Sequence, residues 1–542
     1  MTLVHGGRLV AQALKRHGIT HTFTLCGGHI QAIYDGCLDE GIRVVDVRHE
    51  QTAGHAADGW ARVTGIPGVA LVTAGPGITD VVTALATAQR TGVPMLCIGG
   101  AGPAALQDMG SLQDMDTVTL MRPISKWSAR VPEVGRVKEY IDSALRIAQS
   151  NVPGPVYLEM PLDLLMNYAE DSDPLTAPLA PPRPAGDPDA IERAAALLRA
   201  AERPTFIVGA QLRWARDREI LRKLAEKVRV PYFLNGMARG ALPHAHPCLF
   251  SRSRRQALAE SDLVLVFGTP FDFRVEYGRP GTWNPDGKVV QVDLDGAELG
   301  RNRRIDVAIH GDSGLVLAQL LDAVGSKEAP AWVSTLRASE QRARDKMAAE
   351  IAQSSDPPNP LRVCHELGQR LGKNDVVVGD GGDFVATAAY TIPLEWPQLW
   401  MDPGPLGTLG IGPGFAMAAQ LARPDARAVL VYGDGSFGLH AMEFEAMARQ
   451  KLPVVAVIGN DAAWTQIRRG QVTMYGEERA VATSLTHTRY EQVVEACGGK
   501  GFWVEKLSEL GPALDAAFGA GVPACVNVKI AGSEFRKNAI SV

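Results

Sequence analysis

The sequence predicts an α/β protein built from three Rossmann-like, doubly wound parallel-sheet domains. Short apolar runs alternate with amphipathic helical patterns along most of the chain, as in parallel sheets covered by helices. At 542 residues the chain exceeds the size of a single hydrophobic core. Two proline-containing segments divide the alternation into three blocks. We therefore expect domains at residues 1–170, 190–325 and 361–542.

The first block begins with a helix and continues with short buried strands. Apolar residues at helical spacing predict a helix over Gly7–His17. Continuous apolar runs predict strands at Val44–Val47, Gly68–Thr73 and Met95–Ile98. Residues 171–187 are rich in proline and cannot form a helix, so they are predicted to be a semi-extended linker.

The second block repeats this pattern without a dinucleotide fingerprint. Apolar runs predict strands at Thr205–Val208, Leu263–Phe267 and Val289–Val292. The segment after the first strand lacks the spacing Gly-x-Gly-x-x-Gly, so a nicotinamide-binding oxidoreductase is a weak alternative. Residues 325–360 are rich in Ala, Lys, Glu and Ser and predict a helical connection to the third block.

Composition excludes several classes of protein. The hydrophobic content of 46% and charged content of 21% are typical of a compact globular protein. A net charge of −5 offers no basic field for nucleic acid, and no apolar run of about 20 residues suits a membrane. The N-terminus has no signal-peptide pattern. The seven cysteines are scattered without a Cys-x-x-Cys pair, which favours free thiols in a reducing, cytoplasmic setting.

The third block contains two strand ends that predict a metal site. Residues 429–432 and 454–458 are expected to be buried strands. Gly433-Asp434-Gly435-Ser436 follows the first as a turn before a helix expected over His440–Gln450, and Asn460-Asp461 follows the second. Parallel strands bind ligands beyond their carboxyl ends, so two ends can meet over one anion. Aspartate ligates hard cations, while glycine backbone and a serine hydroxyl suit phosphate. The alternative is a pair of ordinary strand-end turns.

Four ordered motifs carry a resemblance to a known enzyme family. They are His49–Arg62, Thr73–Gly77, Ser111–Asp114 and Gly407–Gly414. Together with the metal motif they resemble the acetolactate synthase branch of thiamine-diphosphate (ThDP) enzymes, over nearly the whole chain. Residues 236–240 (Gly-Met-Ala-Arg-Gly) and 271–274 (Phe-Asp-Phe-Arg) look nearest to the 2-hydroxyacyl-CoA lyases and their relatives. The resemblance implies ThDP and Mg²⁺ as cofactors.

The resemblance also implies catalytic roles in the first block. Glu50 matches the carboxyl group that binds the aminopyrimidine ring and lets the exocyclic nitrogen act as an intramolecular base. An apolar pocket is expected to raise the pKa of Glu50. Gln113 matches a glutamine that donates to a developing oxyanion, and Gly27-Gly28 match a loop facing the reacting carbon. His29 is a candidate acid or base, although a surface or capping histidine is an equal alternative.

The same resemblance assigns the residues that hold the cofactor. Leu409 matches the apolar residue that props the two rings in a bent form, and Asp434, Asp461 and the Ala463 carbonyl match the Mg²⁺ ligands. An asparagine is usual where Asp461 stands. The acetolactate synthases tend to have Gln-His where Asp383-Phe384 stand. The implied cofactor-binding set is Gly27, Gly28, Gly382, Asp383, Gly407, Leu409, Gly433, Asp434, Gly435, Ser436, Asn460 and Asp461.

The central block is expected to hold a nucleotide or none. Members of the family bind FAD there, or ADP and the CoA nucleotide. Arg239, Asp272, Arg274, Asp293 and Asp295 stand where such a nucleotide would lie. The sequence does not decide whether the central block binds FAD, ADP or no nucleotide.

The preferred function is that of a 2-hydroxyacyl-CoA lyase, which releases an aldehyde and formyl-CoA reversibly. Gly470 stands where acetolactate synthases carry a tryptophan that guards the acceptor site, although Trp464 could compensate for its absence. The tail contributes Arg536 and Lys537 as possible phosphate ligands. The alternatives are acetolactate synthesis from 2-oxo acids and a non-catalytic ThDP-fold binding protein. The resemblance implies a homodimer or homotetramer whose subunits share active sites.

Overall fold

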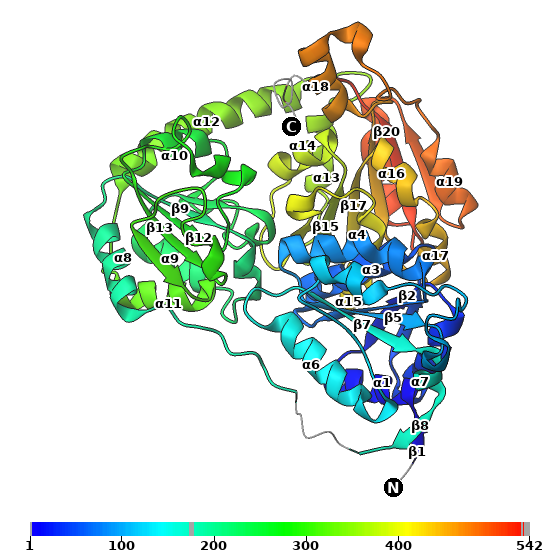
Figure 1. The fold of residues 1–542 in the computed structure, drawn as a ribbon. Coiled ribbons are helices and arrows are strands. Elements are labelled where there is room, and N and C mark those ends of the chain that lie inside the picture. The colour runs from blue at the N-terminus through cyan, green and yellow to red at the C-terminus, as the bar shows by residue number, and fades with distance from the viewer. Residues whose placement is uncertain (1–2, 173–177, 533–534, 536–542) are drawn as a thin grey trace.

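Three six-stranded parallel sheets, each covered by helices, organise the molecule (Figure 1). The computed structural model describes residues 3–172, 178–532 and 535. The α/β fold class predicted from the sequence is confirmed. A small antiparallel pair, β1 (Leu3–His5) with β8 (Tyr168–Glu170), joins the two ends of the N-terminal domain.

The N-terminal sheet has the strand order β3-β2-β4-β5-β7-β6. Its strands are β2 (His21–Thr24), β3 (Arg43–Asp46), β4 (Gly68–Val72), β5 (Met95–Ala101), β6 (Trp127–Arg130) and β7 (Pro155–Pro161). Every residue of β4, β5 and β7 is buried, because helices cover both faces of a parallel sheet. The main covering helices are α1 (Gly6–Arg16), α2 (Gln31–Glu40), α3 (Glu50–Thr64), α4 (Pro76–Thr91) and α6 (Val137–Gln149).

The central sheet has the order β11-β10-β9-β12-β13-β14, which is that of dinucleotide-binding folds. Its strands are β9 (Pro204–Val208), β10 (Tyr232–Leu234), β11 (Leu249–Phe250), β12 (Leu263–Phe267), β13 (Lys288–Asp293) and β14 (Val307–His310). The helices are α8 (Pro188–Ala200), α9 (Ile220–Val228), α10 (Arg254–Glu260) and α11 (Ser313–Ala323). The expected helical connection is α12 (Pro330–Ala352), which runs from the central to the C-terminal domain (Figure 1).

The C-terminal sheet has the order β16-β15-β17-β18-β20-β19. Its strands are β15 (Val376–Asp380), β16 (Leu399–Met401), β17 (Ala428–Gly433), β18 (Val455–Asn460), β19 (Lys500–Val504) and β20 (Ala524–Lys529). Its helices are α13 (Pro360–Gly368), α14 (Asp383–Thr391), α15 (Gly412–Ala422), α16 (Asp434–His440), α17 (Glu443–Arg449), α18 (Thr465–Tyr475), α19 (Tyr490–Ala496) and α20 (Leu507–Phe518).

One local expectation in this domain was wrong. The residues after β17 do not form a turn before a helix at His440, because α16 begins at Asp434 itself. Gly433 is the extended residue before that helix, and a second helix, α17, begins at Glu443. The metal motif therefore combines a strand end with the first turn of a helix, whose free N–H groups suit an anion.

Helices α3 and α15 bring the N- and C-terminal domains into close contact. A methyl group added at Gly59 would lie 2.9 Å from the Phe415 Cα, and one at Gly414 would lie 2.7 Å from the Thr52 carbonyl oxygen. Arg62 forms a buried ion pair with Asp58 and stacks 4.5 Å above the Phe415 ring. The two domains therefore share one core, with backbones closer than any side chain would allow at the two glycines.

The remaining segments agree with the expected connections. The described part of the linker, residues 171–172 and 178–187, contains no helix; residues 173–177 lie outside the described residues. All seven cysteines are free thiols. No helix in the described part of the chain is both long and apolar enough to cross a membrane.

Candidate cofactor and active site

The carboxyl ends of β17 and β18 lie side by side, as the sequence predicts. Gly433 pairs with Gly459 in the parallel register of these strands. Beyond them is a cavity of about 830 Å³ between the central and C-terminal domains. Ten of the residues predicted to bind the cofactor or the metal line it, namely Gly382, Asp383, Gly407, Leu409, Gly433, Asp434, Gly435, Ser436, Asp461 and Ala463.

A buried carboxyl group, Asp434, and a half-buried one, Asp461, lie near each other at this cavity. Burial and the neighbouring Asp461 raise the pKa of Asp434 to about 7, and burial also raises the pKa of Asp461. Asp434 accepts hydrogen bonds from the N–H groups of Gly435 (2.8 Å) and Ala463 (3.2 Å). Asp461 accepts one from the Thr465 hydroxyl. Mutual repulsion of two carboxylates is relieved by a divalent cation, so the donor set fits Mg²⁺.

The protein supplies too few side chains to enclose a metal alone. Among the described residues, no group of three or more His, Cys, Asp or Glu side chains is placed to hold one ion. Mg²⁺ prefers six oxygen ligands and commonly takes part of them from a bound phosphate. Two carboxylates beside a cavity large enough for a diphosphate fit a metal ion that takes its remaining ligands from that diphosphate.

Backbone at close approach forms much of the cavity wall. A methyl group at Gly435 would lie 2.7 Å from the Trp464 ring, and one at Gly382 would lie 2.5 Å from the Gln466 side-chain oxygen. Glycine at these two positions allows the chain to pass close to Trp464 and Gln466, which a larger residue would not. Trp464 itself lines the cavity, whereas Gly470 is buried within α18. The bulky side chain beside the two carboxyl groups is therefore Trp464.

Asp380 is a residue of this site that sequence reasoning did not assign. It lies fully buried at the end of β15, and burial raises its pKa to about 6. Its carboxylate accepts hydrogen bonds from the N–H groups of Gly410 (3.0 Å) and Gly412 (2.7 Å) and from the Ser436 hydroxyl. Asp380 thus ties the helix start after β17 to the glycine-rich loop 407–414. Its place at a strand end was the only available sequence signal.

Asn460 lies behind the site rather than on its surface. Its side-chain amide donates to the Thr488 carbonyl (3.2 Å) and to Asn527 (3.1 Å), and its oxygen accepts from the Ala462 N–H (3.3 Å). Ala462 has a left-handed backbone, with φ at +57°. Asn460 therefore holds the strained loop that presents Ala463, and it is not among the described residues that line the cavity.

Arg469 balances the carboxylate that distinguishes this chain at position 383. The Arg469 guanidinium donates two hydrogen bonds to Asp383, both at 2.9 Å. This fork-to-carboxylate geometry neutralises a charge that would otherwise repel a diphosphate. Helix α18 thereby supplies a cation next to the loop in which the sequence predicted a loss of polar donors.

The predicted residues of the N-terminal domain gather at the turn 73–77, after β4. The His29 ring lies 3.1 Å from the Thr73 hydroxyl, and burial lowers the pKa of His29. A methyl group at Gly75 would lie 2.8 Å from the Gln113 side chain, and one at Gly27 would lie 2.2 Å from Thr73. The segments around residues 27, 75 and 113 therefore meet at one sheet edge, as parallel strands dictate.

Glu50 lies at the start of α3 beside the same turn. It is 7% exposed, and burial raises its pKa as the sequence predicts. A methyl group at Gly77 would lie 3.4 Å from a Glu50 carboxyl oxygen. His49 caps α3 by accepting from the Gln51 N–H (3.1 Å), which gives this histidine a structural role.

The two groups of residues form separate half-sites within one chain. Of the described residues that line the cavity at Asp434, all come from the central and C-terminal domains. Glu50, His29 and Gln113 lie at the edge of a different sheet. The described lining of the cavity at Asp434 therefore does not include the predicted residues of the N-terminal domain.

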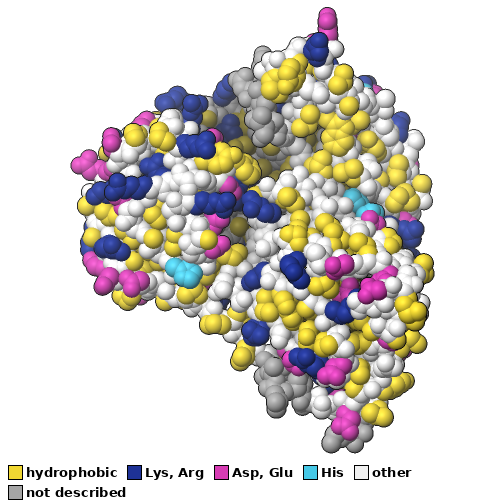
Figure 2. Space-filling model, in the orientation of Figure 1, with side chains coloured by type: hydrophobic (Ala, Val, Ile, Leu, Met, Phe, Trp, Pro, Cys, Tyr) yellow, Lys and Arg dark blue, Asp and Glu magenta, His cyan; other side chains and the backbone are white. Residues whose placement is uncertain are grey.

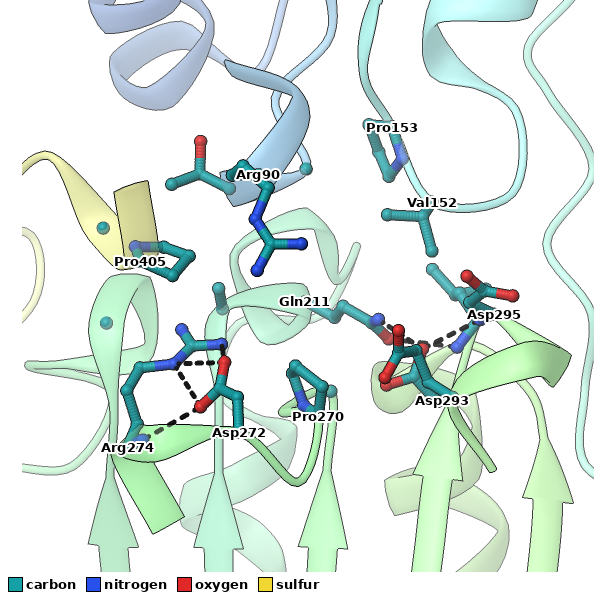
Figure 3. A pocket seen from close by; sticks show the side chains of 18 of the residues that line it. Arg90, Val152, Pro153, Gln211, Pro270, Asp272, Arg274, Asp293, Asp295 and Pro405 are labelled. Carbon is teal, nitrogen blue, oxygen red and sulfur yellow. Dashed lines mark hydrogen bonds and ion pairs between the residues drawn. The ribbon is translucent and has the colours of Figure 1, made fainter. Parts of the chain in front are cut away.

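A second cavity of about 830 Å³ lies where the three domains meet (Figure 3). Asp293 lines it and accepts from the Gln211 amide (2.7 Å) and the Asp295 N–H (2.8 Å). Its other carboxyl oxygen is buried without a hydrogen-bond partner, and burial raises its pKa to about 6. An unpartnered carboxyl oxygen at a strand end of a Rossmann-like sheet fits the hydroxyl groups of a ribose.

The other residues predicted for a nucleotide divide between the cavities. Asp272 and Arg274 form a bidentate ion pair on the wall of the second cavity (Figure 3). Arg239 lies instead on the wall of the first cavity, where it donates to the Ala389 carbonyl (3.3 Å) and faces the Trp400 ring. Arg536 and Lys537 lie outside the described residues.

Sequence comparisons identify the three domains. Thiamine pyrophosphate (TPP) is the same compound as ThDP. Residues 4–120 match the N-terminal TPP binding domain of the thiamine pyrophosphate enzymes. Residues 191–320 match the central domain of those enzymes, and residues 380–528 match their C-terminal TPP binding domain.

Relatives with two different activities resemble the whole chain. A probable acetolactate synthase of Mycobacterium bovis is 40% identical, covering 97% of this chain and 95% of its own length. The 2-hydroxyacyl-CoA lyase 2 of Danio rerio is 38% identical, with 99% and 93% covered. The human 2-hydroxyacyl-CoA lyase 2 is 37% identical, with 99% and 92% covered.

Proposed function

The chain belongs to the thiamine pyrophosphate enzymes, and on that premise we propose that it is a 2-hydroxyacyl-CoA lyase. It would cleave a 2-hydroxyacyl-CoA into an aldehyde and formyl-CoA, reversibly. The supporting observation is the wall of the cavity at Asp434, to which the central domain contributes Arg239, Arg254 and Arg274, the last of them paired with Asp272. A small 2-oxo acid needs one cation for its carboxylate, whereas a phosphate-bearing thioester suits several arginines.

The C-terminal half-site is proposed to anchor the cofactor. Asp434, Asp461 and the Ala463 carbonyl would ligate Mg²⁺, and the backbone of residues 433–436 would face the diphosphate. Gly382 and the paired Asp383 and Arg469 would border the same group. Bound ThDP supplies a nucleophilic carbon that can add to a carbonyl group. Leu409 lines this cavity and would support the bent cofactor.

The N-terminal half-site is proposed to carry out the proton transfers. Glu50, whose pKa is raised by burial, would share a proton with the aminopyrimidine ring. The lowered pKa of His29 keeps its ring neutral and able to accept a proton from the substrate hydroxyl. Gln113 would donate to the oxygen that gains negative charge. Glu50→Gln should slow exchange of the bound cofactor's C2 proton by orders of magnitude, and an NMR exchange rate equal to wild type would refute this role.

Two copies of the chain are proposed to complete each site. Large apolar side chains are exposed beside both half-sites: Met109 (72%) and Leu112 (78%) near Gln113, Leu439 (51%) at the end of α16 and Met442 (56%) just after it. A homodimer, alone or within a homotetramer, would bury these side chains. Inactive Glu50→Gln and Asp434→Ala chains should regain activity when mixed under subunit exchange. Hybrid dimers without activity would contradict shared sites.

The central cavity is proposed to hold FAD or ADP. Asp293, with its unpartnered oxygen, would bind the ribose of either nucleotide. Heat release followed by spectroscopy and mass spectrometry distinguishes a flavin from ADP. Asp293→Ala should lower nucleotide content in the purified protein, and an unchanged content would show that Asp293 is not a ligand.

Acetolactate synthesis is the second candidate, favoured by the Mycobacterium bovis relative. The discriminating experiment incubates the enzyme with a 2-hydroxyacyl-CoA and separately with pyruvate. Aldehyde release from the acyl-CoA supports the lyase. Acetolactate production from pyruvate without aldehyde release from any acyl-CoA would overturn it. Activity in neither assay, despite bound cofactor, would favour a non-catalytic binding protein.

A further inference from the structure

The loop that carries Gln113 joins β5 to α5 (Thr117–Met121) in the N-terminal domain. Residues 104–110 of this loop are exposed. The backbone is left-handed at both Asp108 and Gln113, with φ at +62° in each. Left-handed backbone is strained for residues other than glycine and persists only where surrounding contacts hold it. The part of the loop between residues 107 and 117 therefore depends on anchors elsewhere in the domain.

A buried carboxylate fixes the end of the loop at which α5 begins. Glu159, near the end of β7, is 1% exposed. One of its oxygens accepts a hydrogen bond from the Arg130 Nε–H, and the other accepts from the Thr117 hydroxyl. The Tyr157 hydroxyl lies 2.9 Å from the same Thr117 hydroxyl. A carboxylate bonded in this way leaves Thr117 and Arg130 little freedom to move.

Arg130 extends this anchor to the other end of the loop. It is the last residue of β6, and its Nη1–H donates to the Gln107 side-chain oxygen (2.6 Å) while its Nε–H is paired with Glu159. Between these ends, Gly75 lies against Gln113, since a methyl group on Gly75 would be 2.8 Å from the Gln113 Cβ. One ion pair thus holds both ends of the loop, and the turn after β4 supports its middle.

This ion pair differs from the surface pairs of the same domain. Figure 2 shows acidic and basic side chains intermingled over the N-terminal domain. Before α6, Arg136 pairs with Glu139, and the two side chains are 42% and 43% exposed. Water and salt weaken pairs of that kind, whereas a carboxylate removed from water holds its partners because an unpaired buried charge is costly. The Arg130–Glu159 pair can therefore anchor a loop, and the Arg136–Glu139 pair supplies a matched control.

We propose that Arg130 and Glu159 are positioning residues for Gln113. They hold both ends of the loop, so that the Gln113 amide stays at the edge of the N-terminal sheet and donates to the oxygen that gains negative charge. This inference rests on the proposed role of Gln113 and identifies the residues through which the fold sustains it. A donor of this kind acts at a fixed distance, so a displacement of about 1 Å lowers turnover by roughly a hundredfold.

Amide hydrogen exchange tests whether the pair holds the loop. The informative peptide covers residues 111–117, in which the amides of Asp114 and Thr117 are hydrogen-bonded within the loop. Its exchange should accelerate about tenfold in Arg130→Ala and in Gln107→Ala, which each lose a charge-assisted hydrogen bond. Arg136→Ala should exchange like the wild type. Gln107 is exposed, so Gln107→Ala keeps the test valid if Arg130→Ala misfolds. Equal exchange in all four proteins overturns the inference.

The kinetic expectation is a loss of kcat without a rise in KM. Arg130→Ala should lower kcat by roughly a hundredfold, because a displaced oxyanion donor is missed only in the transition state. Gln107→Ala should lower kcat less. Gln107→Glu should restore it, because a carboxylate at this position still accepts from Arg130. Arg136→Ala should turn over substrate like the wild type. A wild-type kcat in Arg130→Ala would overturn the inference.

A double-variant cycle shows whether the pair acts through Gln113. Added to Gln113→Ala, the change Arg130→Ala should cause no further loss of kcat, since both changes remove the same donor. Additive losses would overturn the inference and leave the role of Gln113 intact. A wild-type kcat in Gln113→Ala would refute that role itself, and the inference with it. Running the cycle with a 2-hydroxyacyl-CoA and with pyruvate makes the result independent of which reaction the enzyme catalyses.

Discussion

Replacing Glu340, on α12, by glutamine should loosen the loop of residues 251–255 from that helix. One carboxyl oxygen accepts from the Ser251 N–H (3.2 Å) and hydroxyl, and the other accepts from the N–H groups of Arg252 and Ser253, from the Ser253 hydroxyl and, at 3.3 Å, also from the Ser251 N–H. Glutamine keeps one acceptor oxygen and places an NH₂ group where the other stood. If the retained oxygen faces Arg252 and Ser253, the Ser251 N–H keeps only the 3.3 Å contact and faces a donor at the other position.

The expected cost follows from these contacts. The weakened Ser251 contact costs about 1 kcal/mol, and loss of the charge weakens the remaining bonds by about 2 kcal/mol in total. Burial alone would raise the pKa of Glu340, but the hydrogen bonds from Arg252, Ser251 and Ser253 hold that pKa below its usual value. The ionised carboxylate of Glu340 is therefore the form that accepts these hydrogen bonds. A total of about 3 kcal/mol corresponds to roughly a hundredfold change in the local opening equilibrium.

Amide hydrogen exchange measures this opening directly. A chain with three domains need not unfold in two states, so exchange in the peptide that contains residues 251–253 is more informative than one melting temperature. Exchange there should accelerate roughly a hundredfold, while peptides of the N-terminal sheet stay unchanged. The control is Glu328→Gln, whose ion pair with Arg229 is 64% exposed on both sides. Wild-type exchange rates in Glu340→Gln would refute the anchoring role.

Three further predictions concern the metal site, pH and domain packing. Asp461→Asn should retain ThDP and Mg²⁺ binding because it removes only the excess charge beside Asp434, whereas Asp434→Ala should lose both in calorimetry; full affinity in Asp434→Ala would exclude the site. Burial raises the pKa of Glu443 to about 7. The folded state therefore binds this proton more tightly than the unfolded state does, so the group adds to the free energy of unfolding below its unfolded pKa. That contribution is lost as pH rises through the folded pKa. Wild type should therefore lose about 3 kcal/mol more than Glu443→Gln between about pH 4.5 and 7 in denaturant titrations, and parallel pH profiles would contradict this. Gly414→Ala should cost about 1–3 kcal/mol because its methyl group meets the Thr52 carbonyl. Gly438→Ala, which meets nothing within 4 Å, should cost less, and equal unfolding midpoints would refute the packing argument.

Sequence patterns predicted those parts of the molecule that depend on neighbours along the chain. Strand ends at residues 433–434 and 460–461 are visible because apolar runs stop there, and parallel pairing then brings the two aspartates together. The raised pKa of Glu50 was expected only through the family resemblance, which implies an apolar pocket for this carboxyl group.

The parts that could not be predicted depend on contacts between distant segments. Asp380 meets Ser436 and the loop at Gly410 only after three strands have assembled. Glu340 meets Ser251 because α12 folds back over the central sheet. Arg239 is close in sequence to the central strands, yet it lies on the cavity at Asp434. No local pattern carries this information, since each partner is set by packing of whole elements.

The outer sheets share one topology, since the order β3-β2-β4-β5-β7-β6 corresponds strand for strand to β16-β15-β17-β18-β20-β19. Helix α3 follows the second strand of one sheet, and α15 follows the second strand of the other. The contact between α3 and α15 is therefore a meeting of equivalent faces, with Gly59 against Phe415 and Gly414 against Thr52. This is the geometry of a symmetric pair of subunits fused into one chain. Duplication of a single ancestral unit would account for it, and the proposed roles would then divide the copies: one for phosphate and metal, the other for proton transfer.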